Sequence, residues 1–123
     1  MIKKNFTPLE ANQRLPLVKK IVSDIQRKAE NFRALMVNIK SGQVAADALV
    51  LEAEVEGLMG ELDELGCFYK DWDFKIGLVD FPSTIDGKPV LLCWRSDEEK
   101  VIWYHDLESG FNGRKLIPEK YLI

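Results

Sequence analysis

Seven residues in the second half of the chain have side chains that could do chemistry. They are a lysine, three acids, a thiol, an imidazole and a guanidinium, at Lys70, Asp71, Asp80, Cys93, Glu98, His105 and Arg114. Asp80, Cys93 and His105 are residue types that bind zinc and related metals. His105 with Asp80, Glu98 and Arg114 would suit a small hydrolase or transferase, because histidine is the usual general base. Whether either set meets depends on the strands that carry it.

The sequence around these residues predicts a small antiparallel sheet. Residues 78–81, 89–95 and 100–105 alternate apolar and polar side chains or are rich in β-branched and aromatic residues, so we expect three strands there. A short edge strand is expected at 114–117. Asp86-Gly87 is a strong turn signal, because both residues tolerate a positive φ. The aromatic and charged stretch 67–74 is expected to be an extended crossover.

The expected turns predict which side chains share a face of the sheet. With a two-residue turn at Asp86-Gly87, Asp80 pairs with Cys93; with a four-residue turn at 96–99, Cys93 pairs with Ile102 and Val90 with His105. Paired residues share a face and successive residues alternate. His105 then lies on the opposite face from Asp80 and Cys93, so we expect no metal centre and no cofactor. An error of one residue in either turn would reverse this expectation.

Each candidate also has a purely structural interpretation. His105 is expected to be a sheet histidine that is hydrogen-bonded to Asp106 or to the backbone. Cys93 has an acid rather than a base as its expected neighbour, so it lacks the activation that a nucleophile needs. Asp80 lies in an apolar strand, and a buried carboxylate is costly unless it is paired. We expect Arg114, Lys70 or backbone donors to pair with it.

The first half of the chain predicts a helical hairpin. Apolar residues recur at alternating steps of three and four from Leu15 to Ile39 and from Val44 to Leu65, which gives each helix one apolar stripe. Ser41-Gly42 separates the two segments. Residues 1–40 hold nine Lys/Arg and three Asp/Glu, whereas residues 41–66 hold seven Asp/Glu and no Lys/Arg. Opposite charge favours an antiparallel pair.

The helix ends carry their own signals. Thr7, Pro8 and Glu10 form the pattern of a capping box with proline at the first helical position. Pro16 removes a backbone donor, so we expect a short opening helix near 8–14 with a kink or break near Leu15. The second helix is expected to end at Gly66.

The predicted fold class is therefore α+β, a long antiparallel helical hairpin with a small three- to four-stranded antiparallel sheet. At 123 residues we expect a single domain, 1–123, with the hairpin in 1–66 and the β-rich part in 67–123. No stretch approaches the roughly 20 apolar residues of a membrane span, so we expect a cytoplasmic protein with reduced, buried cysteines. A net charge of −3 argues against nucleic-acid binding.

Both faces of the second and third strands are apolar in sequence, so both need cover. The hairpin covers one face; the C-terminal tail, a second subunit or a protein partner must cover the other. We therefore expect a homo-oligomer, a dimer first, acting as a self-associating binding or scaffold module without catalytic activity. The expected binding surface is Trp94, Trp103, Phe111, Arg114, Lys70 and Asp71. Convergence of His105, Glu98 and Arg114 in a pocket would instead favour the hydrolase or transferase.

Several runs of residues form a family pattern. They include Gly77-Leu78-Val79-Asp80-Phe81-Pro82, Leu92-Cys93-Trp94-Arg95, Tyr104-His105 and Gly110-Phe111-Asn112-Gly113-Arg114, with Phe6-Thr7 and Leu15-Pro16 near the start. Over nearly its whole length the chain resembles the bacterial family called domain of unknown function 2203. It departs from the family pattern at Asp97, where the family has glycine, and at Tyr104, where it has tryptophan. The family name carries no function, so the resemblance implies a fold unit and no activity.

Overall fold

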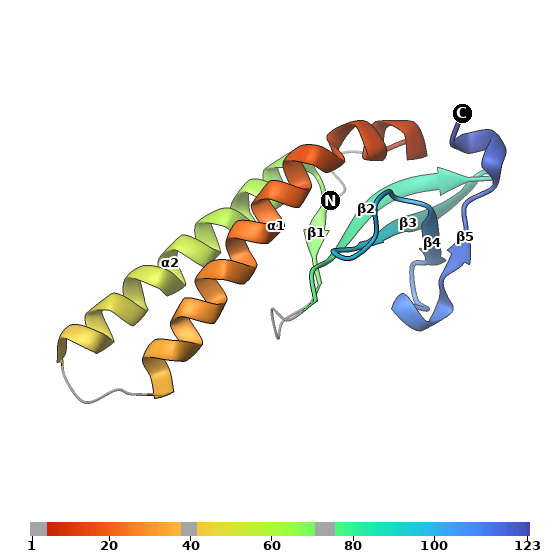
Figure 1. Ribbon diagram of the computed structural model, residues 1–123. Coiled ribbons are helices and arrows are strands. Elements are labelled where there is room, and N and C mark those ends of the chain that lie inside the picture. Colours follow the sequence, from red (N-terminus) through yellow and green to blue (C-terminus); the bar gives the residue numbers. More distant parts are fainter. Residues whose placement is uncertain (1–4, 38–41, 71–75) are drawn as a thin grey trace.

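The computed structural model describes residues 5–37, 42–70 and 76–123 and has a long helical hairpin beside a five-stranded antiparallel sheet (Figure 1). The elements are α1 (Pro8–Val37), α2 (Gly42–Leu65), β1 (Phe68–Tyr69), β2 (Leu78–Ile85), β3 (Lys88–Arg95), β4 (Trp103–Asp106), η1 (Phe111–Gly113), β5 (Lys115–Leu116) and η2 (Glu119–Tyr121). The predicted α+β class and the antiparallel hairpin are confirmed. Among these residues the sheet has five strands, because residues 68–69 form a strand where we expected a crossover.

The first turn of α1 has the predicted capping box. The Glu10 carboxylate accepts the Thr7 N–H at 2.9 Å, and the Thr7 hydroxyl accepts the Glu10 N–H at 3.1 Å. The predicted break near Leu15 is wrong, since α1 continues through Pro16. Residues on both sides of this proline, among them Ala11, Leu15 and Val18, are buried. Their packing outweighs the roughly 3 kcal/mol that an interior proline costs a helix.

The end of α2 is fixed by Gly66, as predicted. Gly66 has a φ of +96°, the left-handed region that glycine adopts without strain. The Cys67 N–H donates to the Leu62 carbonyl at 3.2 Å and the Gly66 N–H to the Asp63 carbonyl at 3.0 Å, which is a Schellman motif. The predicted loop residue Ser41 lies outside the described residues. None of the described helices is long and apolar enough to cross a membrane.

The strands follow the order β1-β2-β3-β4-β5, and each neighbouring pair is antiparallel. Asp86 and Gly87 have φ values of +52° and +79°, so the predicted Asp-Gly turn joins β2 to β3. One face of these two strands packs against α1 and forms the core. Its buried members on the sheet are Val79, Phe81, Ile85, Val90, Leu92 and Trp94.

The register between β2 and β3 is the predicted one, with Asp80 opposite Cys93. The register between β3 and β4 differs by one residue from the predicted one, because Cys93 pairs with Trp103 and Leu91 with His105. The strand predicted at 100–105 corresponds to β4, which begins at Trp103 rather than at Lys100. Trp103 and His105 therefore share a face with Asp80 and Cys93.

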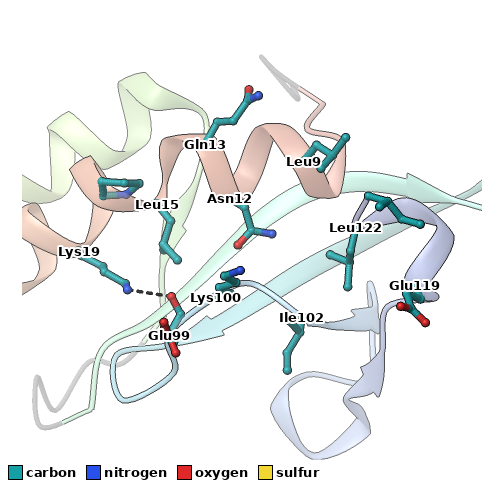
Figure 2. Close-up of a pocket in the computed structure, with 12 residues that line it drawn as sticks. Leu9, Asn12, Gln13, Leu15, Lys19, Glu99, Lys100, Ile102, Glu119 and Leu122 are labelled. Atoms are coloured by element: carbon teal, nitrogen blue, oxygen red, sulfur yellow. Dashed lines mark hydrogen bonds between the residues drawn. The ribbon is translucent and has the colours of Figure 1, made fainter.

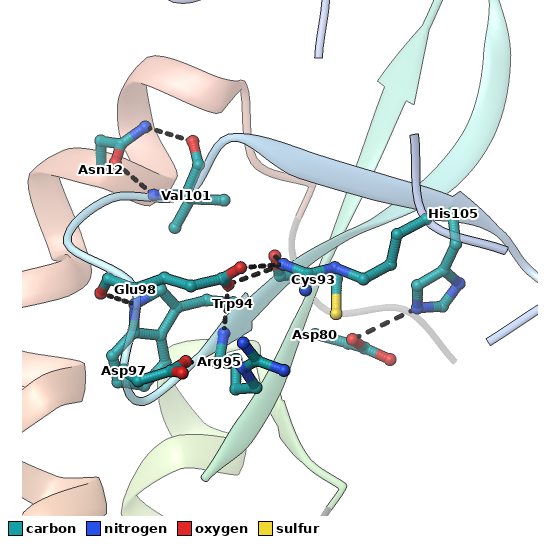
Figure 3. Close-up of polar contacts among 10 residues, drawn as sticks. Asn12, Asp80, Cys93, Trp94, Arg95, Asp97, Glu98, Val101 and His105 are labelled. Carbon is teal, nitrogen blue, oxygen red and sulfur yellow. Dashed lines mark hydrogen bonds and ion pairs between the residues drawn. The ribbon is translucent and has the colours of Figure 1, made fainter. Parts of the chain in front are cut away.

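Helix α1 causes this shift by drawing the β3–β4 connection away from the sheet. Asn12 accepts the Val101 N–H at 2.8 Å and donates to the Val101 carbonyl at 3.0 Å (Figure 3). Lys19 donates to the Glu99 carbonyl at 2.8 Å (Figure 2). Val101, fully buried, therefore pairs with a helix instead of β3. The connection runs over residues 96–102 and is longer than the predicted four-residue turn.

Candidate functional site

The observed register brings together Asp80, Cys93 and His105, one from each of the three central strands. One ligand atom from each residue lies within 4.8 Å of the other two. The three residues are 5%, 2% and 3% exposed. The prediction that these side chains lie on different faces is wrong, because the second turn is longer than we expected. The group will be called the buried triad.

The orientation of His105 is fixed by its own strand. Its Nδ1 lies 2.7 Å from the backbone oxygen of Asp106. A carbonyl oxygen only accepts, so Nδ1 must carry the hydrogen in this contact. In the neutral ring Nε2 then carries a lone pair, and it lies 3.4 Å from Asp80 Oδ1. The expected backbone hydrogen bond of His105 is confirmed.

Burial is the main influence on the two other members of the triad. It raises the pKa of the Asp80 carboxyl, while the neighbouring His105 and the more distant Lys70 act in the opposite direction. Burial, together with the negative charge of Asp80, raises the pKa of the Cys93 thiol to about 12. The thiol is therefore protonated at neutral pH. Asp80 interacts with His105 and Cys93 and, more weakly, with the expected Lys70, whereas the expected Arg114 pairs with Glu98 instead.

The buried triad lies at a small cavity of about 280 Å³. Lys70 and Glu108 contribute charged groups to its wall. The remaining wall is formed by Leu78, Leu91, Leu107, Gly110 and Phe111. The chemistry-bearing side chains therefore line a partly open pocket that combines an apolar wall with two opposite charges.

Glu98 and Arg114 form a separate, partly buried ion pair. Arg114 Nη2 lies 2.6 Å and 2.7 Å from the two carboxylate oxygens of Glu98, and the side chains are 10% and 16% exposed. Glu98 also accepts the Arg95 N–H at 2.8 Å, and its carbonyl accepts the indole N–H of Trp94 at 2.8 Å (Figure 3). Glu98 thus fixes the turn after β3.

Cys93 connects the ion pair to the other two members of the buried triad. Its carbonyl accepts a hydrogen bond from Arg114 at 3.3 Å, whereas its thiol interacts with Asp80. Asp80 and His105 line the cavity, but Glu98 and Arg114 are not among the lining residues. The four residues proposed for a hydrolase or transferase are therefore divided into two pairs, Asp80–His105 and Glu98–Arg114, which lie on the two sides of Cys93.

The expected aromatic binding surface is divided between the core and the surface of the molecule. Trp94 is 1% exposed and belongs to the core. The guanidinium of Arg114 lies over Trp103 at 4.9 Å and over Phe111 at 4.6 Å. Lys70 lies 5.9 Å from the ring of Phe68. The segment with η1 thus covers part of the second face of the sheet. Asp71, the remaining residue of the expected binding surface, lies outside the described residues.

A second cavity, of about 740 Å³, lies between the start of α1 and the C-terminal segment (Figure 2). Leu9, Leu15, Ile102 and Leu122 give it an apolar lining, with charged groups at Lys19, Glu99, Lys100 and Glu119. It contains no histidine or cysteine. It therefore lacks the ligand and nucleophile types found at the buried triad.

Sequence reasoning missed Asn12 and Lys19, the residues that set the register of the site. A polar residue next to the buried stripe of a helix is the one available signal for Asn12. It indicates that a hydrogen bond is needed but does not identify Val101 as the partner.

Asp97, where the family pattern has glycine, pairs with Arg95 at 2.6 Å, and this hydrogen bond lowers the pKa of Asp97.

Residues 4–117 match the family described as "Uncharacterized conserved protein (DUF2203)". The chain belongs to this family. No curated protein and no solved structure matches the chain. In this DUF2203 protein the two most specific runs of the resemblance supply Asp80 and Cys93, and Tyr104-His105 supplies the third member of the triad. The family description assigns no activity, so function has to be inferred from the structure.

Proposed function

We propose that this DUF2203 protein is a self-associating binding or scaffold module, and that two copies meet along the α1–α2 hairpin. Incomplete burial of the apolar stripe of α2 carries this proposal. Every seventh residue is buried, at Ala48, Val55 and Leu62. The alternate stripe positions, Leu51, Leu58 and Leu65, are half-buried. A second pair of helices would cover them, as in a four-helix coiled coil.

The end of the hairpin away from the sheet is the least covered part. The hairpin extends beyond the sheet (Figure 1). No residue of α1 after Ala29 is buried, and the exposed apolar side chains there and on the facing turn of α2 are Met36, Val37, Leu49 and Val50. We call residues 30–37 and 46–57 the distal hairpin. Apolar surface grouped in this way supports a protein contact.

A groove of about 550 Å³ runs between the two helices at the start of the distal hairpin. Its apolar floor is formed by Ala29, Phe32, Val55 and Met59. One wall carries Arg33 from α1, and the other carries Glu52 and Glu56 from α2. A two-fold axis would bring the basic wall of one copy onto the acidic wall of the other. Charge complementarity therefore supports a second copy of this chain as the occupant.

Sedimentation velocity over a concentration series tests the proposal. We expect wild-type protein to dimerise, and Phe32→Asp to shift it to monomer by placing a charge on the floor of the groove. Leu17→Asp is the matched control, because Leu17 is an exposed apolar residue of the same helix outside the groove. A charge-swap variant with Arg33→Glu, Glu52→Arg and Glu56→Arg should dimerise again, whereas Arg33→Glu alone should not. Wild-type protein that stays monomeric at millimolar concentration would overturn the proposal.

A small hydrolase or transferase is the second candidate, and the His105–Asp80 contact at the cavity favours it. His105 would act as the general base through Nε2, the ring nitrogen that is not engaged by its backbone contact. A panel of activated ester and phosphoester substrates tests this candidate. Turnover that is lost in His105→Asn and kept in Lys100→Ala would support it. No turnover by wild-type protein would remove it.

We also propose a cytoplasmic location. Cys67 and Cys93 are both free and buried, which is the usual state of cysteines in a reducing compartment. Cell fractionation with an antibody to the protein tests this location directly.

A further inference from the structure

We propose that the buried triad of Asp80, Cys93 and His105 binds a transition-metal ion, zinc in the first instance, with one coordination position open to the cavity. This site is independent of the hairpin contact. Zinc bonds of about 2.0 to 2.3 Å in a tetrahedron place ligand atoms roughly 3.3 to 3.8 Å apart. The three ligand atoms lie within 4.8 Å of one another. Small side-chain rotations therefore suffice to bring them onto one ion.

The hydrogen bond of His105 is a separate observation that supports metal binding. Histidines that bind metals usually donate the other ring N–H to a carboxylate or a backbone carbonyl, which fixes the tautomer and the ring plane. His105 makes this contact from Nδ1 to the Asp106 carbonyl at 2.7 Å. Nε2 is then the ring nitrogen left to bind a metal, and it lies 3.4 Å from Asp80 Oδ1. The contact thus holds the ring plane in the orientation that a metal-binding histidine needs.

The donor atoms indicate the class of ion. One nitrogen, one sulfur and one carboxylate oxygen suit zinc and its neighbours in the first transition row. Magnesium and calcium instead take oxygen ligands almost exclusively. The triad is also deeply buried, and an unpaired carboxylate there is costly. A divalent ion would compensate the charges of Asp80 and of an ionised Cys93 together.

The triad supplies three ligands, and the cavity of about 280 Å³ adjoins them. Structural zinc sites generally have four protein ligands, whereas sites that bind a water or a substrate keep one position open. Lys70 and Glu108 also line the cavity. The ammonium of Lys70 would favour a small anion at the open position.

Binding of the metal alone to wild-type protein is the first test. Protein freed of metal with a chelator is titrated with zinc chloride, with magnesium chloride as the control, by isothermal titration calorimetry. We expect one zinc ion per chain and no binding of magnesium. Cobalt chloride should give two spectral features. One is a thiolate-to-cobalt charge-transfer band in the near-ultraviolet, and the other is the set of visible bands that tetrahedral cobalt shows. Absence of the charge-transfer band would overturn the assignment of Cys93, whether or not the variants fold.

Matched variants connect the ion to the triad. Cys93→Ser and His105→Gln should each weaken zinc binding by about 100-fold or more, since each removes one of three ligands. Cys67→Ser is the control, because Cys67 is an equally buried thiol that is bonded to the Leu62 carbonyl at 3.4 Å and is not part of the triad. Circular dichroism checks that each variant is folded. Zinc binding that is unchanged in Cys93→Ser and His105→Gln would show an adventitious surface ion and overturn the proposal.

Discussion

The sheet and the distal hairpin differ in how their apolar surface is covered and held. On the sheet, single polar contacts place each segment: Asn12 holds Val101, and Glu98 holds Arg114. In the hairpin, a repeated apolar spacing places the helices, and several stripe residues stay half-exposed. Specific polar contacts fix atoms to within a fraction of an ångström, which a metal or a catalytic site requires. A repeating apolar stripe fixes only a surface, which is sufficient for association.

The strongest test of this comparison removes the partly buried ion pair of the sheet, Arg114–Glu98. Arg114→Met keeps an apolar chain against Trp103 and Phe111 but leaves the Glu98 carboxylate without its counter-charge. We expect a loss of about 3 kcal/mol in the free energy of unfolding, measured by urea denaturation. Arg95→Met is the control, because the Arg95–Asp97 pair is more exposed and its loss should destabilise the protein much less. Equal effects of the two variants would contradict the role of burial.

The next largest effect is expected where α1 holds the β3–β4 connection. Asn12→Ala leaves the Val101 N–H and carbonyl without their partners, which should cost about 2 kcal/mol. Amide hydrogen exchange at Val101 should become faster, since the connection loses its contact with the helix. Gln13→Ala, at the neighbouring exposed position, is the control. Unchanged exchange at Val101 would contradict the contact.

Gly77 tests the close approach of α1 to the start of β2. A Cβ at this position would collide with Val22 Cγ1 and lie 3.2 Å from Ser96 Cβ. Gly77→Ala should therefore destabilise the protein by about 1 to 3 kcal/mol in thermal unfolding. Adding Val22→Ala should recover part of the loss in a double-mutant cycle. Simple additivity of the two substitutions would argue against the steric explanation.

The smallest effect, of opposite sign, is expected in the hairpin. Gly57 lies within α2, and a Cβ there would meet nothing within 4 Å. Gly57→Ala should stabilise the protein by about 0.5 to 1 kcal/mol, because alanine loses less backbone freedom in a helix than glycine does. The thermal midpoint measures this gain. A loss of stability would indicate that the surface around Gly57 is closely packed, which would contradict the incomplete cover of the hairpin.

Features fixed by neighbouring residues were predictable from the sequence. The capping box at Thr7, the Schellman end at Gly66 and the Asp86-Gly87 turn each depend on a few adjacent residues. The Asp80–Cys93 pairing followed from that turn. The continuity of α1 through Pro16 was not predictable, because it depends on packing from other parts of the chain.

The buried triad was missed for the same physical reason. The position of His105 relative to Cys93 depends on a hydrogen bond between Asn12 and Val101, which are 89 residues apart in the chain. No local pattern in residues 96–102 encodes that contact. A one-residue change in strand register exchanges the two faces of a strand, so the contacts that Asn12 and Lys19 make with this connection bear on whether three ligand types meet.

The position of the sheet at one end of the hairpin has a consequence for avidity. Helix α1 has 30 residues and is therefore about 45 Å long. Two copies joined in opposite directions along their distal hairpins would hold their two cavities at opposite ends of a stiff rod. Ligand groups spaced along one polymer or surface would then be bound bivalently, and the second binding step would depend on effective concentration. The length of the hairpin would select the spacing that both cavities can reach.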